Sequence, residues 1–329
     1  MRYTKPHLSL EQQVGLLLQK GLIADRSELW ERLRDIGYYR LSAYTHPFKQ
    51  RNKQGVILSS FSPGTTLDNI ITHYRFDRQL RLLLLDSIER IEVALRSILV
   101  NLHTAHHGAF EYAASSYFPR WDGYMQQIEK ARIRRDKNKR IIYRGEEYID
   151  HFFSKYGDYH DYLPLWMAVG NFEMGTIVYF FIHSTEQIRQ KIADHWQTDR
   201  NALTSWLQAL RGLRNICAHH GRVWNRHFMF PPKIPAYSHD KRWHLVYSEK
   251  AHKWVKPTAS LQGAPSMANS ANHVAALLFI CRQLMHSIAP HSRWHERAEQ
   301  LITSAAANGI NIHKMALPQH WQRHPLWTL

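Results

Sequence analysis

The stretch YRFDRQLRLLLLDSIERIEVALR, from Tyr74 to Arg96, shows the strongest helical periodicity in the chain. From Leu80 to Ile98 the apolar residues recur at steps of three and four, the spacing that keeps one face of a helix apolar. Polar positions are supplied by Asp77, Arg81, Glu89, Glu92 and Arg96. We therefore predict a long core helix over residues 67–102.

The charged residues of this helix allow two interpretations. Glu92 and Arg96 stand four positions apart, so they can form an ion pair along one helix face, and this is the commoner explanation for charges at such a spacing. The other interpretation turns Glu92 or Arg96 toward an active centre. The sequence leaves both interpretations open.

Capping and turn residues mark further helices. Ser9, with Gln12 three residues later, is typical of a capping box, and Gly21 is a natural end for the helix that follows. Residues 50–68, rich in Gly, Ser, Asn and Pro, favour a loop. The apolar run LPLWMAVGNFEMGTIVYFFI predicts one buried helix. Other helices are expected over residues 27–36, 146–155, 186–196, 201–220, 271–289 and 293–306.

Together these elements predict an all-α fold in three parts. Residues 1–62 would form a small N-terminal helical lobe, residues 63–230 a helical core, and residues 231–329 an irregular, partly helical C-terminal extension packed on that core. Residues 231–272 are expected to be a long loop or a short hairpin. Of 329 residues, 44% are hydrophobic and 12% aromatic, which is enough for a sizeable core.

Charge is the most informative feature of the composition. The chain has 43 Lys and Arg against 27 Asp and Glu, a net charge of +16 and a sequence pI near 9.9. This excess favours a polyanionic partner, nucleic acid first. The two cysteines, Cys217 and Cys281, suggest no disulfide framework and fit a reducing cytosol. No signal peptide or transmembrane stretch stands out, so we expect a cytoplasmic protein with no membrane partner.

A second stretch, RGLRNICAHHGRVWNR from Arg211 to Arg226, concentrates residues that could perform chemistry. At about 100° per residue, Arg211, Asn215 and His219 fall within about 80° of one another, and Arg214 flanks that stripe. The stretch ends a predicted helix, so the sequence predicts a polar, cationic face near a helix C-terminus.

This face has a structural and a functional interpretation. In the structural one, the arginine and asparagine side chains are solvated and the histidines cap or pair within the fold. In the functional one, His219 transfers protons near neutral pH, Arg214 holds two oxygens of a phosphate, and Asn215 orients the histidine. Gly221 is a natural stop for the helix. These are the groups needed to cleave RNA without a metal, and no metal or cofactor is expected.

The string from Arg214 to His219 resembles the Arg-x4-His motif of HEPN-superfamily ribonucleases. Its extension HHGRVWN is similar to the form found in AbiD/AbiF-like abortive infection proteins of bacteria. Four further stretches strengthen the resemblance, occur in that family's order and cover nearly the whole chain: IGYYRLSAYTHPFK (36–49), YRFDRQLRLLLLDSIERIEVALR (74–96), LPLWMAVGNFEMGT (163–176) and KMALPQHWQRHPLW (314–327).

The resemblance implies a HEPN-like helical bundle that forms a homodimer with a composite ribonuclease site. It assigns the motif Arg to Arg214, the following Asn to Asn215 and the motif His to His219, while His220 could share or take over the histidine role. It also implies antiphage or toxin-like cleavage of RNA by attack of the 2′-hydroxyl. The alternative is a non-catalytic HEPN module that binds a small non-coding RNA.

The remaining cations supply candidate contacts to single-stranded RNA. The candidate RNA-binding residues are Arg40, Lys130, Arg132, Arg134, Arg135, Lys137, Lys139, Arg140, Arg211 and Arg222. A charge run such as residues 130–140 is often only a solvated face, and in this basic chain phosphate contacts are equally plausible. Around Arg40, the tyrosines at positions 38, 39 and 44 could stack on bases, although packing of the N-terminal lobe is the favoured interpretation.

Overall fold

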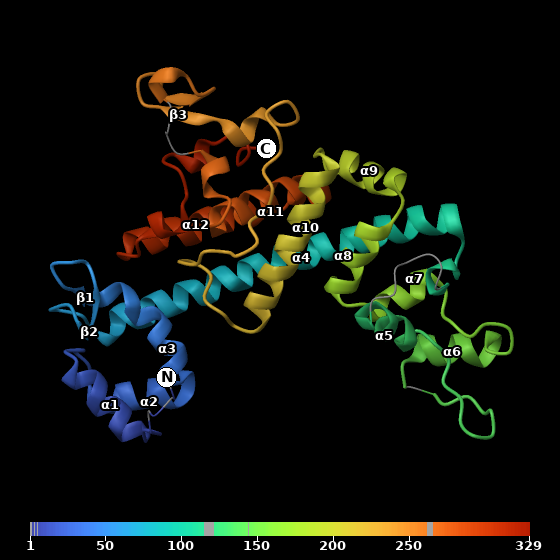
Figure 1. Cartoon of the computed structure of the whole chain (residues 1–329), viewed down its shortest axis with the longest axis horizontal. Coiled ribbons are helices and arrows are strands. Elements are labelled where there is room, and N and C mark those ends of the chain that lie inside the picture. Colours follow the sequence, from blue (N-terminus) through green and yellow to red (C-terminus); the bar gives the residue numbers. More distant parts are fainter. Residues whose placement is uncertain (1, 3, 5, 115–121, 144, 262–265) are drawn as a thin grey trace.

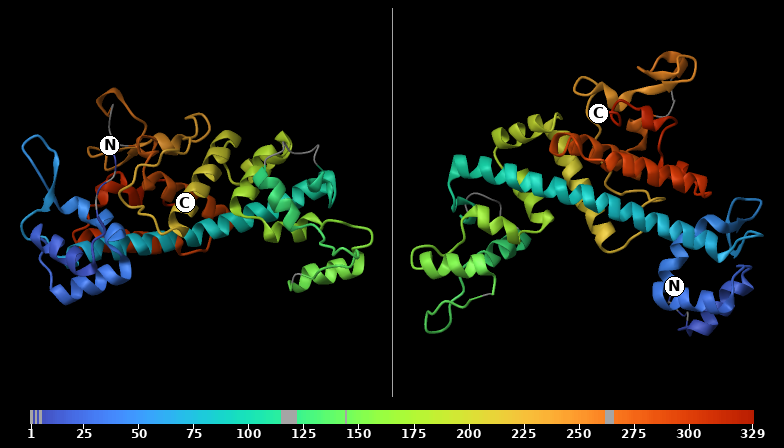
Figure 2. Two further views of the ribbon diagram at one scale, coloured as in Figure 1. Left: turned by 60° about the horizontal axis from the view of Figure 1, so that its bottom comes forward. Right: turned by 180° about the vertical axis from the view of Figure 1, so that it is seen from behind.

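The computed structural model describes residues 2, 4, 6–114, 122–143, 145–261 and 266–329. Over these residues the protein is mostly helical, with two small strand pairs, which confirms the all-α prediction. Helix α4 (Leu67–His107) is the axis of the molecule. It runs from the N-terminal lobe at one end to helices α5–α8 at the other, and Figures 1 and 2 show these two groups at opposite ends in every view.

Helix α4 extends the predicted core helix as far as His107. It begins with a capping box, in which Thr66 and Asn69 exchange side-chain to backbone hydrogen bonds. It ends at Gly108, whose φ of 82° is accessible to glycine at little cost. With 41 residues the helix is about 60 Å long, so one element supports both ends of the molecule.

The N-terminal lobe consists of α1 (Leu10–Gln19), α2 (Arg26–Ile36) and α3 (Tyr38–Thr45). The predicted capping box of α1 is present, because the Ser9 hydroxyl accepts from the backbone of Gln12 and the Gln12 side chain accepts from the backbone of Ser9. Helix α3 packs on α4 and joins the lobe to the rest of the molecule. Helices α1 and α2 lie close to the predicted boundaries, whereas no helix was predicted over the tyrosine-rich stretch that forms α3.

The prediction of a loop over residues 50–68 is wrong in part. Strands β1 (Lys49–Arg51) and β2 (Ile57–Phe61) form an antiparallel hairpin. The Asn52 side chain holds the turn by accepting hydrogen bonds from the backbone of Gln54 and Val56. These local hydrogen bonds order a polar segment whose composition alone favours a loop.

The apolar run after Leu163 is also broken where one helix was predicted. It forms α7 (Leu165–Ala168), a short 3-10 turn, and α8 (Met174–His183). At the break, the Arg96 guanidinium of α4 donates a hydrogen bond to the carbonyl oxygen of Phe172 at 3.1 Å. A partner distant in sequence therefore satisfies a carbonyl group released by the interruption.

The remaining elements pack along α4. Helix α10 crosses it, and α11 and α12 lie beside it (Figure 1). Nearly all of α11 is buried, and the Trp294 indole of α12 donates to the Leu83 carbonyl oxygen of α4 at 2.8 Å. Trp321 and Trp327 are buried and anchor the C-terminal tail as expected. The bounds of these elements are α5 (Asp122–Lys130), α6 (Glu147–Tyr156), α9 (Glu186–His195), α10 (Arg200–Ala218), β3 (Val246–Ser248), β4 (Lys253–Val255), α11 (Val274–Ile288) and α12 (Trp294–Ala307).

One continuous apolar cluster joins these parts, from Val14 in α1 to Trp327 in the tail. The segment expected to be a loop or short hairpin contains the hairpin β3–β4. Across the described residues, no helix has the length and apolar character needed to span a membrane.

Candidate functional site

Helix α10 positions the residues of the second stretch. Asp199 caps its N-terminus by accepting hydrogen bonds at 2.9 Å from the backbone of Asn201 and Ala202. The buried side chains of the helix recur at helical spacing and are Ala202, Leu203, Trp206, Leu207, Leu210, Leu213 and Cys217. This apolar stripe fixes the helix on the core, so its polar residues face outward.

The predicted cationic face lies on the protein surface. Arg211, Arg214, Asn215, His219 and His220 are all exposed. Among the residues that the structure describes, the side chains of Arg211 and Arg214 take part in no ion pair or hydrogen bond. Their guanidinium groups are therefore available to an anionic ligand.

The last turn of α10 sets the direction of the two histidines. His219 is the C-cap, and His220 has a left-handed φ of 58°, which is uncommon outside glycine. The His220 N–H donates to the Cys217 carbonyl at 2.9 Å, and the Gly221 N–H donates to the Ile216 carbonyl at 2.7 Å. This pair of hydrogen bonds is a Schellman motif, which directs the chain out of the helix.

The helix thus ends at Ala218, two residues earlier than predicted, and the left-handed residue is His220, directly before the glycine expected to stop the helix. A Cβ at position 221 would lie 3.0 Å from the Cγ2 atom of Ile216 and 3.2 Å from its carbonyl oxygen, so a larger residue there would crowd the end of the helix. The predicted orientation of His219 by Asn215 has only a backbone counterpart in the described structure: the His219 N–H donates to the Asn215 carbonyl at 2.9 Å.

On one flank of α10, Arg214 faces carboxylates of α4. Leu82, Leu85, Glu89 and Glu92 line a cavity of about 390 Å³ together with Arg214. Burial raises the pKa of Glu92, and the charges of its neighbouring guanidinium groups oppose that rise. The predicted i,i+4 ion pair also exists, since Glu92 lies 2.7 Å from the Arg96 guanidinium. Glu92 therefore combines a structural contact with a place beside the candidate catalytic arginine.

On the other flank, Arg211 and Asn215 line a hollow of about 480 Å³. The opposite wall is the segment from Arg226 to Phe230. The structure thus places Arg211 and Asn215 in one hollow, as the predicted stripe requires, whereas Arg214, about 60° from Arg211 around the helix, lines the neighbouring hollow.

The segment after α10 is held by Asp77 of α4. This carboxylate is fully buried and accepts hydrogen bonds at 2.9 Å from the backbone of Val223 and of Trp224. The Tyr44 hydroxyl of α3 donates to it at 2.6 Å. The buried Arg81 guanidinium forms an ion pair with the same carboxylate. The exit of α10 is therefore fixed to two other helices.

Asp77 and Arg81 are buried structural residues. The sequence predicts them only as polar positions of an amphipathic helix. Burial and the adjacent Asp77 carboxylate raise the pKa of the Tyr44 hydroxyl, which keeps it protonated as a donor. The four-residue spacing of Asp77 and Arg81 is the sequence signal for their ion pair, but surface ion pairs have the same spacing.

Two of the predicted RNA-binding arginines contact the same segment. The Arg222 guanidinium donates to the Ala43 carbonyl oxygen at 2.6 Å, and the Arg40 guanidinium lies 3.5 Å from the His220 carbonyl oxygen. Both contacts bind the α10 exit to α3. Arg40 and His220 also line a cavity of about 420 Å³ beside α4, together with Arg78.

The basic turn, residues 130–143, lies far from this site. Figure 1 shows it beside α5 and α6, at the end of the molecule opposite the N-terminal lobe. Lys130 pairs with Glu173 at 3.3 Å, and Arg132 pairs with Glu129 at 3.5 Å. The Arg135 guanidinium donates to carbonyl groups within and beside the turn. The exposed remainder of the predicted RNA-binding set in this turn is Arg134, Lys137, Lys139 and Arg140.

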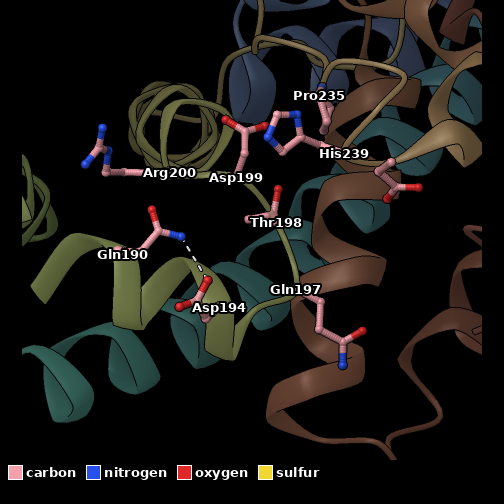
Figure 3. A pocket seen from close by; sticks show the side chains of 9 residues that line it. Gln190, Asp194, Gln197, Thr198, Asp199, Arg200, Pro235 and His239 are labelled. Carbon is pink, nitrogen blue, oxygen red and sulfur yellow. Dashed lines mark hydrogen bonds between the residues drawn. The ribbon is translucent and has the colours of Figure 1, made fainter. Parts of the chain in front are cut away.

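A polar hollow also lies at the opposite end of α10. Gln190 and Asp194 of α9, Arg200 of α10 and His239 of the following connection surround it, and Gln190 donates to Asp194 at 2.8 Å (Figure 3). Its carboxylates, which include the helix cap Asp199, make it a poor site for a polyanion. Neither Arg214 nor His219 is among the residues that line this hollow.

The tyrosines around Arg40 divide between the two interpretations. Tyr44 is buried and packs edge to face on Tyr74, in agreement with the packing interpretation, whereas Tyr39 is 91% exposed.

Burial raises the pKa of the Cys217 thiol to about 12, so that it stays protonated beside the histidines. No group of His, Cys, Asp and Glu side chains suited to a metal ion occurs among the described residues.

Comparison with known protein families places this region in one of them. No curated protein and no solved structure shows significant similarity to the chain. A family model described as Abi-like protein matches residues 31–225, more than half of the 329 residues. The matched region includes α3, α4 and α10 and ends just after the backbone groups that Asp77 binds. The chain therefore belongs to the Abi-like protein family.

Proposed function

We propose that this protein is a metal-independent endoribonuclease that acts in abortive infection. Membership of the Abi-like family indicates an abortive-infection role. The observation that supports the enzymatic part is the end of α10, where Arg214 in the helix and His219 at its C-cap are both exposed, and where the core and Asp77 hold the backbone in place. Phosphoryl transfer requires a base and a cation at the reacting phosphate, and this held backbone carries one of each.

In the proposed reaction, the RNA 2′-oxygen attacks the adjacent phosphorus. His219 accepts the proton of the 2′-hydroxyl, and a second histidine donates a proton to the departing 5′-oxygen. Arg214 stabilises the negative charge that develops on the phosphoryl oxygens. The products are a 2′,3′-cyclic phosphate and a 5′-hydroxyl end. Because the Asn215 amide is exposed and has no hydrogen bond to His219 among the described residues, we assign it to the phosphate.

The second histidine in this proposal comes from a second copy of the chain. On α4, Leu82 and Val93 are 50% and 54% exposed. They are eleven residues apart and so lie about 20° from each other around the helix. Leu82 also borders the Arg214 cavity. On the same face of α4, the carboxylates Asp86 and Glu89 lie between these two apolar residues. A homodimer formed over this face would cover Leu82 and Val93 and bring the two α10 ends together.

The chemistry is tested by cleavage of single-stranded RNA in excess EDTA, followed by analysis of the new ends. We expect cyclic-phosphate ends, and we expect a single 2′-deoxy substitution at the cleavage site to prevent cutting there. Arg214→Ala and His219→Ala should each lower the rate by about 10²–10⁴-fold. The matched control is Arg200→Ala, which changes an arginine at the far end of the same helix.

Cutting that persists at a 2′-deoxy position would contradict the mechanism. RNA that is bound but left intact by folded wild-type protein would favour the non-catalytic module instead.

For the dimer, Leu82→Glu should yield monomers in light scattering and lower cleavage, whereas Val56→Glu, at an exposed position of the β1–β2 hairpin, should do neither. A dimer unaffected by Leu82→Glu would place the interface elsewhere.

A further inference from the structure

The hollow on the Arg211 flank of α10 has the features of a built surface. Its two walls are the helix, from Gln208 to Ile216, and the segment from Arg226 to Phe230. Its volume of about 480 Å³ falls within the range of about 300–1,000 Å³ that is usual for small-molecule sites. The hollow is therefore large enough for one nucleotide.

The outer wall is fixed to the body of the protein. The Phe228 N–H donates to the Asn272 carbonyl oxygen at 2.9 Å, just before α11. The His227 ring packs against His273 with 4.3 Å between ring centroids. Phe228 is half-buried, whereas Met229 and Phe230 are 87% and 82% exposed at the rim. A fixed backbone therefore presents large apolar side chains to solvent, which costs free energy unless a ligand covers them.

The polar groups of the hollow suit a polyanion. Arg211 and Asn215 stand on the helix wall, and Arg226 stands on the outer wall. None of the residues that line this hollow is acidic, in contrast to the Arg214 flank, where Glu89 and Glu92 lie beside the arginine. Cations beside exposed aromatic rings are the combination by which single-stranded nucleic acid is bound.

We infer that this hollow is a subsite for one nucleotide of single-stranded RNA, with the base stacked on the Phe230 ring and the flanking phosphates paired with Arg211 and Arg226. The inference rests on the proposed function, because it places that nucleotide next to the bond that His219 would cleave. Stacking on an aromatic face accepts any base, so the subsite gives affinity for unpaired RNA with little sequence preference.

Binding is separated from cleavage by working in the His219→Ala background. The probe is a short single-stranded RNA carrying 2-aminopurine, whose fluorescence falls when the base stacks. We expect quenching on binding, and we expect Phe230→Ala to abolish most of the quenching and to weaken binding by about 5- to 100-fold. Arg226→Ala should weaken binding while the quenching at saturation is retained.

Trp166→Ala is the matched control, because it removes another exposed aromatic side chain, on α7 at the distant end of the molecule. It should leave both affinity and quenching unchanged. Since Phe230 is itself exposed, its removal should leave the thermal unfolding curve unaltered, which keeps the test independent of folding.

Unchanged affinity and quenching in Phe230→Ala would overturn the inference. If Phe230→Ala instead changed the mass of the assembly in light scattering and left RNA binding intact, the hollow would be a protein interface, which also overturns it. The proposed function fails separately: wild-type protein that binds and quenches the probe but never cuts RNA would support the subsite and contradict the nuclease.

Discussion

The C-terminal end of α10 and the basic turn of residues 130–143 are both cationic, but they hold their charges in different ways. At the end of α10, Arg211 and Arg214 project from a helix whose opposite face is buried. In the basic turn, Lys130 and Arg132 pair with glutamates, and Arg135 binds carbonyl groups of the chain. The turn has the greater density of positive charge, but Lys130, Arg132 and Arg135 make contacts within the protein that stabilise the turn.

Charge density in the sequence thus indicates what kind of partner the protein binds. The location of a site is indicated by the residues that hold the backbone around a charged group in place. The exit of α10 is held by a buried carboxylate, Asp77, that binds two backbone N–H groups. The basic turn is held by Asp136, which is half-buried and accepts from the backbone of Asn138 and Arg140. A catalytic group must be held within fractions of an ångström, and the first arrangement is suited to that demand.

The two aspartates give the largest expected difference. Asp77→Ala leaves the buried Arg81 charge without its partner, which should lower the free energy of unfolding by about 3–5 kcal/mol. Asp136→Ala removes hydrogen bonds at the surface and should cost about 1 kcal/mol. Urea denaturation of both variants measures the difference. Equal losses would mean that the α10 exit is no more firmly held than the turn.

A second comparison sets an exposed histidine of α10 against a buried one in the tail. Burial lowers the pKa of His324 from 6.5 to about 3, and its ring accepts a hydrogen bond from the Leu326 N–H. As pH falls below 6.5, the unfolded chain binds a proton that the folded chain binds only near pH 3. His324 therefore contributes full stability above about pH 6.5 and loses it as pH falls toward 3, by up to about 1.4 kcal/mol per pH unit.

His324→Asn should flatten this part of the stability curve, measured by urea denaturation between pH 7 and pH 4. His219 is exposed where His324 is buried, so its side chain is open to a ligand. A slope that does not decrease at all in His324→Asn would contradict this assignment, because the part that remains belongs to other buried histidines such as His103, whose pKa burial lowers to about 4.

The smallest effect is expected in the basic turn. Replacing Arg134, Lys137, Lys139 and Arg140 by alanine should weaken RNA binding uniformly across sequences and reduce the salt dependence by about 0.7 per lost phosphate contact. Binding titrations at several salt concentrations measure this slope. An unchanged slope would show that the turn makes no phosphate contacts, which would sharpen the contrast with α10.

Local signals in the sequence predict much of the fold. The capping box at Ser9 and the periodicity after Leu67 give α1 and α4 with small errors, because the groups that define them are neighbours in the chain. The hairpin β1–β2 was missed, although Asn52 and Gly55 are residues typical of a tight turn. A strand pair without apolar alternation gives little other signal.

The errors in longer-range features have a common cause. The break between α7 and α8 is stabilised by Arg96, which is distant in sequence, so a continuous apolar run predicts one helix. Burial of Asp77 and Arg81 depends on loop backbone that approaches from the end of α10. The polar face from Arg211 to His219 was predictable from helical geometry, but its two unlike flanks depend on which elements pack beside it.

The most direct test of the account is the single-turnover rate of RNA cleavage at saturating RNA, measured for His219→Ala and for the alanine variant of the basic turn. We predict that His219→Ala lowers this rate by at least about 100-fold, while the turn variant cuts at the wild-type rate once RNA is saturating. The opposite pattern, with cleavage lost in the turn variant and retained in His219→Ala, would contradict the assignment of the site to the end of α10.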